Sequence, residues 1–193
     1  MVNFGIECAF EINGMKLENL LSQKRPAILE KWFDGVLETY PAETARFLRK
    51  QTNRFANPVG STISQGIEGL FEALLQGIDS DKVSIFLDNI IRVRAVQDFS
   101  PSQAVAFIFV LKKVIREELK GEIRENSISE ELLIFESKID KLALLSFDIY
   151  TKCREKVYEL KVSETKRMLF GLLKKANLIC EIPEQKPDLK REH

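Results

Sequence analysis

The chain has 193 residues, of which 29 are Lys or Arg and 29 are Asp or Glu, and its single histidine is His193. Without an internal histidine, the sequence offers no Ser-His-Asp or Cys-His catalytic group, no HExxH zinc site and no histidine ligand for haem. A net charge of zero argues against general binding to nucleic acid or to an anionic membrane, which usually needs a surplus of basic residues.

The composition indicates one helical domain. Nine glycines and six prolines are few for this length, and 45% apolar residues suffice for a sizeable core. No apolar run is long enough to span a membrane, and no secretory signal is visible. The three cysteines, Cys8, Cys153 and Cys180, are odd in number and far apart, which fits reduced thiols in the cytoplasm.

The expected organisation is an N-terminal extension over 1–14, a helical domain over 15–180 and a polar, disordered tail over 181–193. Residues 1–14 lack helical periodicity and end in a turn signal. They are either an extension ahead of a natural start at Met15 or a short ordered arm.

Two helices are expected first. Apolar residues recur at helical spacing from Lys16 to Thr39, with a kink or fresh start at Pro26. Tyr40-Pro41 ends this segment, because the residue before a proline is pushed out of the α region. A short helix from Ala42 to about Gln51 follows.

The next helix is expected to begin at Asn57-Pro58, with Asn57 as N-cap, and to run to about Gln76. Its interior contains Gly66 and Gly69 on one face of small residues. Since each glycine costs a helix about 1 kcal/mol, we expect a crossing helix to approach closely here; a ligand or a hinge is the alternative.

The following helix is expected over Asp81–Asp98, with Asp79 or Ser80 as its cap. Polar residues continue its apolar row. They are Arg94 and Gln97, and Ser100 then begins a helix through a capping box with Pro at its first position. A buried charge must be paired or hydrogen-bonded. Arg94 and Gln97 therefore either bind the start of the Ser100 helix, as a structural polar cluster with Asn57, or line an internal pocket or a dimer surface.

The last helix is expected from Ser127 or Ser129 to about Ala176. It either breaks near Val162–Thr165 or projects from the domain, because a helix of this length exceeds the width of one domain. Its apolar row follows a four–three spacing that is longer than one domain face needs. We expect the centre of this row to supply a homodimer surface through Ile139, Leu142, Ser146, Ile149 and Cys153.

No catalytic, metal-binding or cofactor-binding constellation emerges from the sequence, so we expect a protein that is not an enzyme. The carboxylates mostly stand beside Lys or Arg at the spacing of solvated helix pairs. Cys153 precedes Arg154, whose charge favours a thiolate, but Cys153 also falls on the apolar row and is more simply a buried thiol.

Several segments together resemble the RsbRD N-terminal domain family, which is named after co-antagonists of the kinase RsbT in the bacterial stressosome. The resemblance covers roughly residues 15–180, and its most specific part runs from Arg92 to Ala104. The segments are Trp32 with Thr39-Tyr40-Pro41, Arg54 to Gly60, Ile91 to Ala104, and Cys153 to Lys156.

The resemblance implies an all-α, globin-like, haem-free sensory or regulatory domain that forms a homodimer and binds protein partners, including regulatory kinases or STAS-type proteins. Such domains run on through a long last helix into a phosphorylatable STAS domain, for which this sequence has no counterpart after Leu160. The alternative is a small-ligand or cofactor-binding protein with an internal pocket near Arg94 and Gln97.

Overall fold

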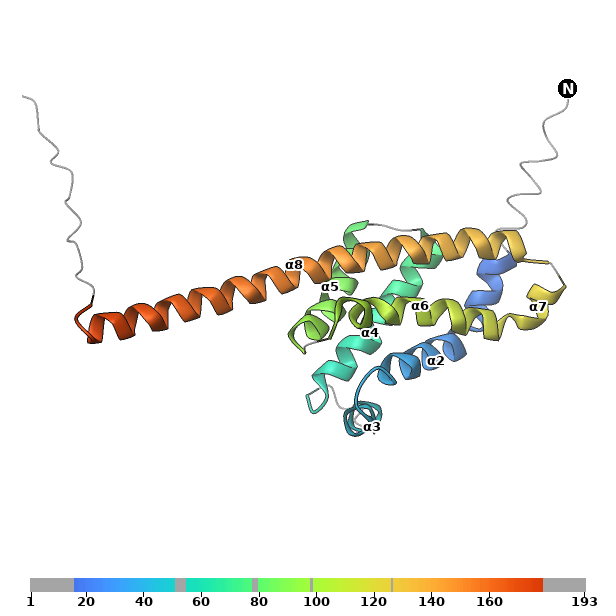
Figure 1. The fold of residues 1–193 in the computed structure, drawn as a ribbon. Helices are drawn as coiled ribbons and strands as arrows, with labels where there is room; N and C mark the ends of the chain where they lie inside the picture. The colour runs from blue at the N-terminus through green and yellow to red at the C-terminus, as the bar shows by residue number, and fades with distance from the viewer. Residues whose placement is uncertain (1–15, 51–54, 78–79, 98, 126, 179–193) are drawn as a thin grey trace, which may run out of the picture. The chain divides into compact units, whose positions relative to one another are not determined.

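The computed structural model describes residues 16–50, 55–77, 80–97, 99–125 and 127–178, and within these ranges every regular element is a helix (Figure 1). The all-α fold with a long last helix is thereby confirmed. The expected N-terminal extension over 1–14 and the expected tail over 181–193 lie outside the described residues. A helical stretch covers 16–23, and the helices that follow are α2 Arg25–Leu37, α3 Ala42–Lys50, α4 Pro58–Gln76, α5 Ser80–Val96, α6 Pro101–Glu118, α7 Lys120–Arg124 and α8 Ser129–Lys175.

The chain divides into two compact units, one up to Arg154 and the other from Glu155 onward. The first unit contains α2 to α7 and the first part of α8. The second contains the rest of α8, which is one uninterrupted helix over 47 residues. The expected break near Val162–Thr165 does not occur.

Helix starts agree with the capping signals. Asn57 caps α4 by accepting a hydrogen bond from the backbone N–H of Gly60 at 2.8 Å. Ser100 caps α6 in a reciprocal capping box with Gln103. Each cap satisfies backbone donors that a helix leaves open at its first turn, so both boundaries are determined locally. The expected cap at Asp79 or Ser80 lies outside the described side chains.

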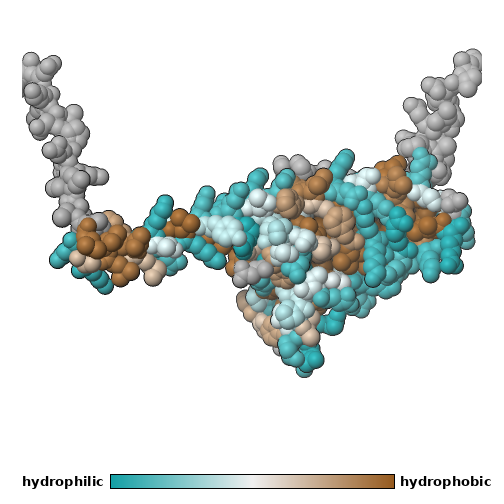
Figure 2. Space-filling model, viewed as in Figure 1, coloured by the Kyte–Doolittle hydropathy of each residue, from teal (hydrophilic) through white to brown (hydrophobic). Residues whose placement is uncertain are grey.

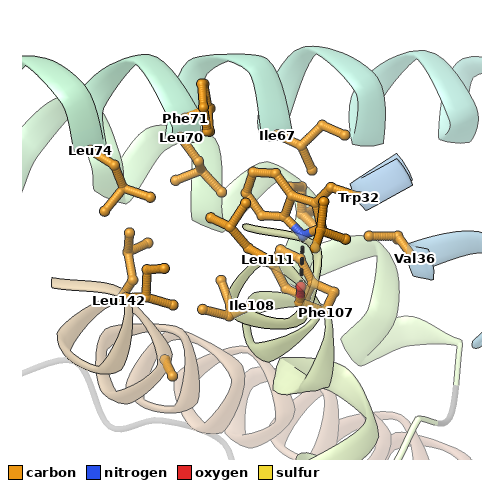
Figure 3. Packing of buried hydrophobic residues seen from close by; sticks show 14 of the residues in the cluster. Trp32, Val36, Ile67, Leu70, Phe71, Leu74, Phe107, Ile108, Leu111 and Leu142 are labelled. Atoms are coloured by element: carbon orange, nitrogen blue, oxygen red, sulfur yellow. Dashed lines mark hydrogen bonds between the residues drawn. The ribbon is translucent and has the colours of Figure 1, made fainter. Parts of the chain in front are cut away.

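The core of the first unit is built around Trp32 of α2, which is fully buried (Figure 3). Its indole N–H donates to the carbonyl of Phe107 in α6 at 2.7 Å, so the largest side chain of the core also satisfies its polar atom. Helix α2 packs beside α6 and α4. The side chains that share this core in Figure 3 are drawn from α2, α4, α6 and α8: Val36, Ile67, Leu70, Phe71, Leu74, Phe107, Ile108, Leu111 and Leu142.

The glycines of α4 lie where α5 crosses it. A Cβ atom at Gly66 would meet Ile90 Cδ1 at 2.6 Å, and one at Gly69 would meet the Phe86 ring at 2.5 Å. The expected close approach of a crossing helix is confirmed, and the glycines allow the two backbones to come together.

The inward row of α8 lies against the core of its own chain. Ile139, Leu142 and Ser146 are buried, and the hydroxyl of Ser146 donates to the carbonyl of Leu142 at 2.8 Å. Ile149 and Cys153 are half-buried against the same core. The expectation that these five residues form a dimer surface is therefore wrong, because the four–three row is already covered by helices of the same chain.

Candidate functional site

Arg94, in the last turn of α5, is the one charged side chain that is buried within the described residues, and its exposed fraction is 0%. Nowhere in the described ranges does a carboxylate lie within ion-pair distance of it. Removing a guanidinium from water is costly unless other groups stabilise the charge. The surroundings of Arg94 must therefore supply that stabilisation.

Hydrogen bonds from Arg94 join two distant parts of the chain. Its Nη1 donates to the carbonyl of Gln103 at 3.0 Å. Its Nη2 donates to Thr39 Oγ1 at 2.9 Å and to the carbonyl of Val36 at 3.5 Å. The guanidinium thus fastens the end of α2 to the first turn of α6, which confirms the expectation that Arg94 binds the start of the Ser100 helix.

Aromatic rings supply the rest of the environment of Arg94. The guanidinium carbon lies 5.4 Å from the ring centre of Tyr40, 5.0 Å from that of Phe99 and 5.1 Å from that of Phe107. Tyr40 and Phe99 meet edge to face at 5.1 Å. Ring faces attract a cation, most strongly where water is excluded. We call Arg94 with Thr39, Tyr40, Phe99 and Phe107 the Arg94 cluster.

Protonation in the Arg94 cluster does not change near neutral pH. Burial lowers the pKa of Arg94, but a guanidinium stays charged in proteins. Burial raises the pKa of Tyr40, against the opposing effect of the Arg94 charge. Among the described residues, Arg94 Nε and the Tyr40 hydroxyl make no hydrogen bond. The cluster is therefore a fixed buried cation rather than a proton switch.

Helix α8 is attached to the corner between α5 and α6. The Tyr150 hydroxyl donates to the carbonyl of Phe99. Arg154 Nη1 donates to the carbonyl of Ala95 at 2.9 Å, which satisfies a carbonyl left open in the last turn of α5. The corner that carries Arg94 therefore also holds the last part of α8 that belongs to the first unit.

The other polar residues singled out from the sequence do not share one site. Gln97 is exposed, so the prediction that Gln97 and Arg94 together line an internal pocket is wrong. Asn57 is buried at the separate corner between α3 and α4, where its Nδ2 donates to the carbonyl of Leu48 at 2.8 Å. Ser100 is exposed and caps α6.

Sequence reasoning missed the partners of Arg94. Thr39 and Tyr40 indicate locally only the end of a helix, although an aromatic residue directly after a helix end is a candidate for burial. The position of Arg154 beside Cys153 predicts a cation that favours a thiolate, whereas its guanidinium also donates to Ala95. Nothing local in the sequence connects Tyr150 to Phe99.

The fold and the Arg94 cluster define an all-α domain whose helix ends are joined by a buried cation. Residues 26–164 match the family described as the RsbT co-antagonist protein rsbRD N-terminal domain. The chain belongs to this family, as the resemblance implied. The segments that carried the resemblance include Thr39, Tyr40, Arg94, Phe99 and Arg154, all of which take part in the contacts described above.

A protein of the archaeon Archaeoglobus fulgidus, described as uncharacterized, is 27% identical to this chain over 145 residues. The alignment covers 72% of this chain and 83% of the relative. No solved structure matches the chain.

Proposed function

We propose that the protein is a stressosome-like regulatory module in the cytoplasm that acts by binding other proteins and has no catalytic activity of its own. Membership of the RsbRD N-terminal domain family supports this proposal, since the family description names a co-antagonist of another protein. Proteins of the regulatory-kinase or STAS type are the partners that the family suggests. A homodimer is the first assembly to test.

The observation that carries the proposal is an exposed apolar face on α6 and α8, which we call the α6–α8 face. It consists of Phe109, Leu144 and Phe147, whose exposed fractions are 47%, 70% and 47%. Ion pairs Lys112–Asp140 and Arg116–Glu136 show that α6 and α8 lie antiparallel to each other (Figure 1). The register of these pairs brings Phe109 to the level of Leu144.

The α6–α8 face suits a protein partner. Figure 2 shows hydrophobic side chains over the first half of α8 and beneath it, bordered by hydrophilic ones. Apolar side chains inside a charged border are typical of interfaces. Lys112 and Asp140 at this border are paired with each other, so a partner that covers the face leaves neither charge unpaired. A second copy placed here would use the outward side of α8 and leave the buried row in the core.

Light scattering coupled to size-exclusion chromatography tests the homodimer. We expect the unchanged chain to be a dimer and the double variant Leu144→Glu/Phe147→Glu to be a folded monomer, since two charges would be buried against the partner. The matched control is Ile85→Glu, which changes an exposed apolar residue of α5 and should leave the dimer intact. A folded double variant that remains a dimer overturns the assignment of this face.

A further inference from the structure

The last part of α8 and the turn that follows, residues 165–178, form a cationic segment in a chain of zero net charge. This basic segment carries Lys166, Arg167, Lys174 and Lys175 and has no Asp or Glu. The overall neutrality of the chain therefore does not describe this segment.

The basic segment ends as a capped helix. Asn177 adopts a positive φ of 53°, its N–H bonds to the carbonyl of Lys174, and the N–H of Leu178 bonds to the carbonyl of Leu173. These two bonds form the Schellman arrangement that closes many helices. Basic residues in the last turn also complement the negative end of the helix dipole, so the segment is a defined helical end.

The side chains of the basic segment are sorted around the helix. At about 100° per residue, Arg167 and Lys174 fall opposite the apolar face, and Lys166 and Lys175 mark its two borders. The apolar face consists of Met168, Leu169, Leu172, Leu173 and Ala176, whereas Phe170 falls outside it, between Lys166 and Lys174. Met168 and Leu172 are more than 60% exposed. Figure 2 shows this end of the chain as a hydrophobic cluster with hydrophilic side chains beside it.

We propose that the basic segment docks onto an anionic lipid surface, with its apolar face in the interfacial region and its cations at the headgroups. A helix with an apolar face, a cationic face and cations at the border is the type that lies in a membrane interface. Each Lys or Arg near such a surface adds attraction to anionic lipids. None of the helices in the described part has the length and apolar character to cross a bilayer, so the attachment is peripheral.

Charge favours a lipid surface over a second copy of this chain. Val162, Leu169 and Leu172 are separated by seven and three positions, a spacing that would also suit a coiled coil. However, Lys166 and Lys175 flank that row, and the basic segment has no carboxylate to meet them. Pairing two copies in parallel would bring these like charges together, whereas an anionic surface neutralises them.

Vesicle co-sedimentation of the full chain tests the proposal. We expect the protein to sediment with vesicles that mix phosphatidylcholine and phosphatidylglycerol, and not with phosphatidylcholine alone. Binding should fall as salt rises, because salt screens exposed charges. Lys166→Gln/Lys175→Gln should weaken binding roughly 30-fold, since each cation near the surface contributes about 1 kcal/mol.

Two further variants make the test specific. Lys141→Gln/Lys152→Gln removes the same charge from exposed positions of α8 outside the basic segment, and it should weaken binding less than roughly threefold because those cations are remote from the surface. Leu169→Ser/Leu172→Ser leaves the charge unchanged and should weaken binding roughly tenfold or more, through loss of apolar burial.

The proposal is overturned by equal binding to neutral and mixed vesicles, by no binding to either, or by equal effects of the two lysine pairs. It is also overturned if Leu169→Ser/Leu172→Ser changes the oligomeric state and leaves vesicle binding unchanged, because the face would then pair with a second copy. Vesicle binding does not depend on the α6–α8 face, so Leu144→Glu/Phe147→Glu should retain it whether or not the dimer proposal holds.

Discussion

Helix α8 carries apolar residues on both sides of Arg154, but the two regions use them differently. Before Arg154, Ile139 and Leu142 are covered by other helices of the chain and belong to the core. After Arg154, Leu169 and Leu172 are more than half exposed. A helical repeat of apolar residues therefore indicates that a face will be covered, but it does not say by what.

The polar side chains of α8 mark where its role changes. Tyr150 and Arg154 donate to the corner between α5 and α6, and Arg154 is the last residue of α8 that belongs to the first unit. The residues beyond them include the basic segment, where no side chain is fully buried. Stability should therefore depend on the first region and surface binding on the second.

Replacing a leucine in each region gives the largest expected contrast. Leu142→Ala removes buried methyl groups from a packed core and should lower the free energy of unfolding by about 3 kcal/mol. Leu172→Ala changes an exposed position and should alter it by less than about 0.5 kcal/mol. Urea unfolding followed by circular dichroism measures both. Similar losses in the two variants would show that the second region is also covered.

Arg94 provides the next contrast, against an arginine two positions earlier in the same helix. Arg94→Met removes the hydrogen bonds to Gln103 and Thr39 and should cost about 2 kcal/mol, because hydrogen bonds from charged groups exceed the usual contribution. Arg92 is mostly exposed and pairs with Asp88 at i,i+4, so Arg92→Met should cost less than about 0.5 kcal/mol.

Urea unfolding of both arginine variants measures these two losses of stability. If Arg94→Met lowers the free energy of unfolding as little as Arg92→Met does, the aromatic rings and carbonyls around Arg94 barely offset the cost of burying its charge. Arg94→Lys sharpens the result. A lysine keeps the charge but not the planar fork that reaches the ends of both α2 and α6, so it should recover only part of the stability.

Local features of the fold were predictable from the sequence. Asn57 and Ser100 are followed by proline and cap the helices they were expected to begin, because a cap depends on residues three positions apart. Gly66 and Gly69 predicted a close crossing for a similar reason. An interior glycine is costly in a helix, so two glycines on one face indicate that another helix packs closely against that face.

Features that depend on contacts distant in sequence were not predictable. Arg94 and Thr39 are 55 positions apart, and no local pattern pairs them. Helical spacing predicts Gln97 beside Arg94, but α5 ends at Val96, so that spacing no longer applies. The long repeat of the inward row of α8 suggests a dimer surface, whereas only the packed structure shows which helices cover the row.

The smallest expected effects come from glycines, and they have opposite signs in the two units. Gly66→Ala places a methyl group 2.6 Å from Ile90 Cδ1. The cost of overpacking exceeds the gain in helix propensity, for a net loss of about 1 kcal/mol. A Cβ atom at Gly171 meets nothing within 4 Å, so Gly171→Ala should stabilise the second part of α8 by up to about 1 kcal/mol.

Amide hydrogen exchange distinguishes these outcomes, because the two glycines affect local unfolding in different helices. Gly171→Ala should slow amide exchange roughly fivefold within 165–178 and leave the core amides unchanged, since local helix opening exposes only that segment. Gly66→Ala should speed exchange in α4 and α5. If Gly171→Ala instead speeds exchange around residue 171, the Gly171 side of α8 packs against another surface. The basic segment would then be covered on that side as well as on its apolar face.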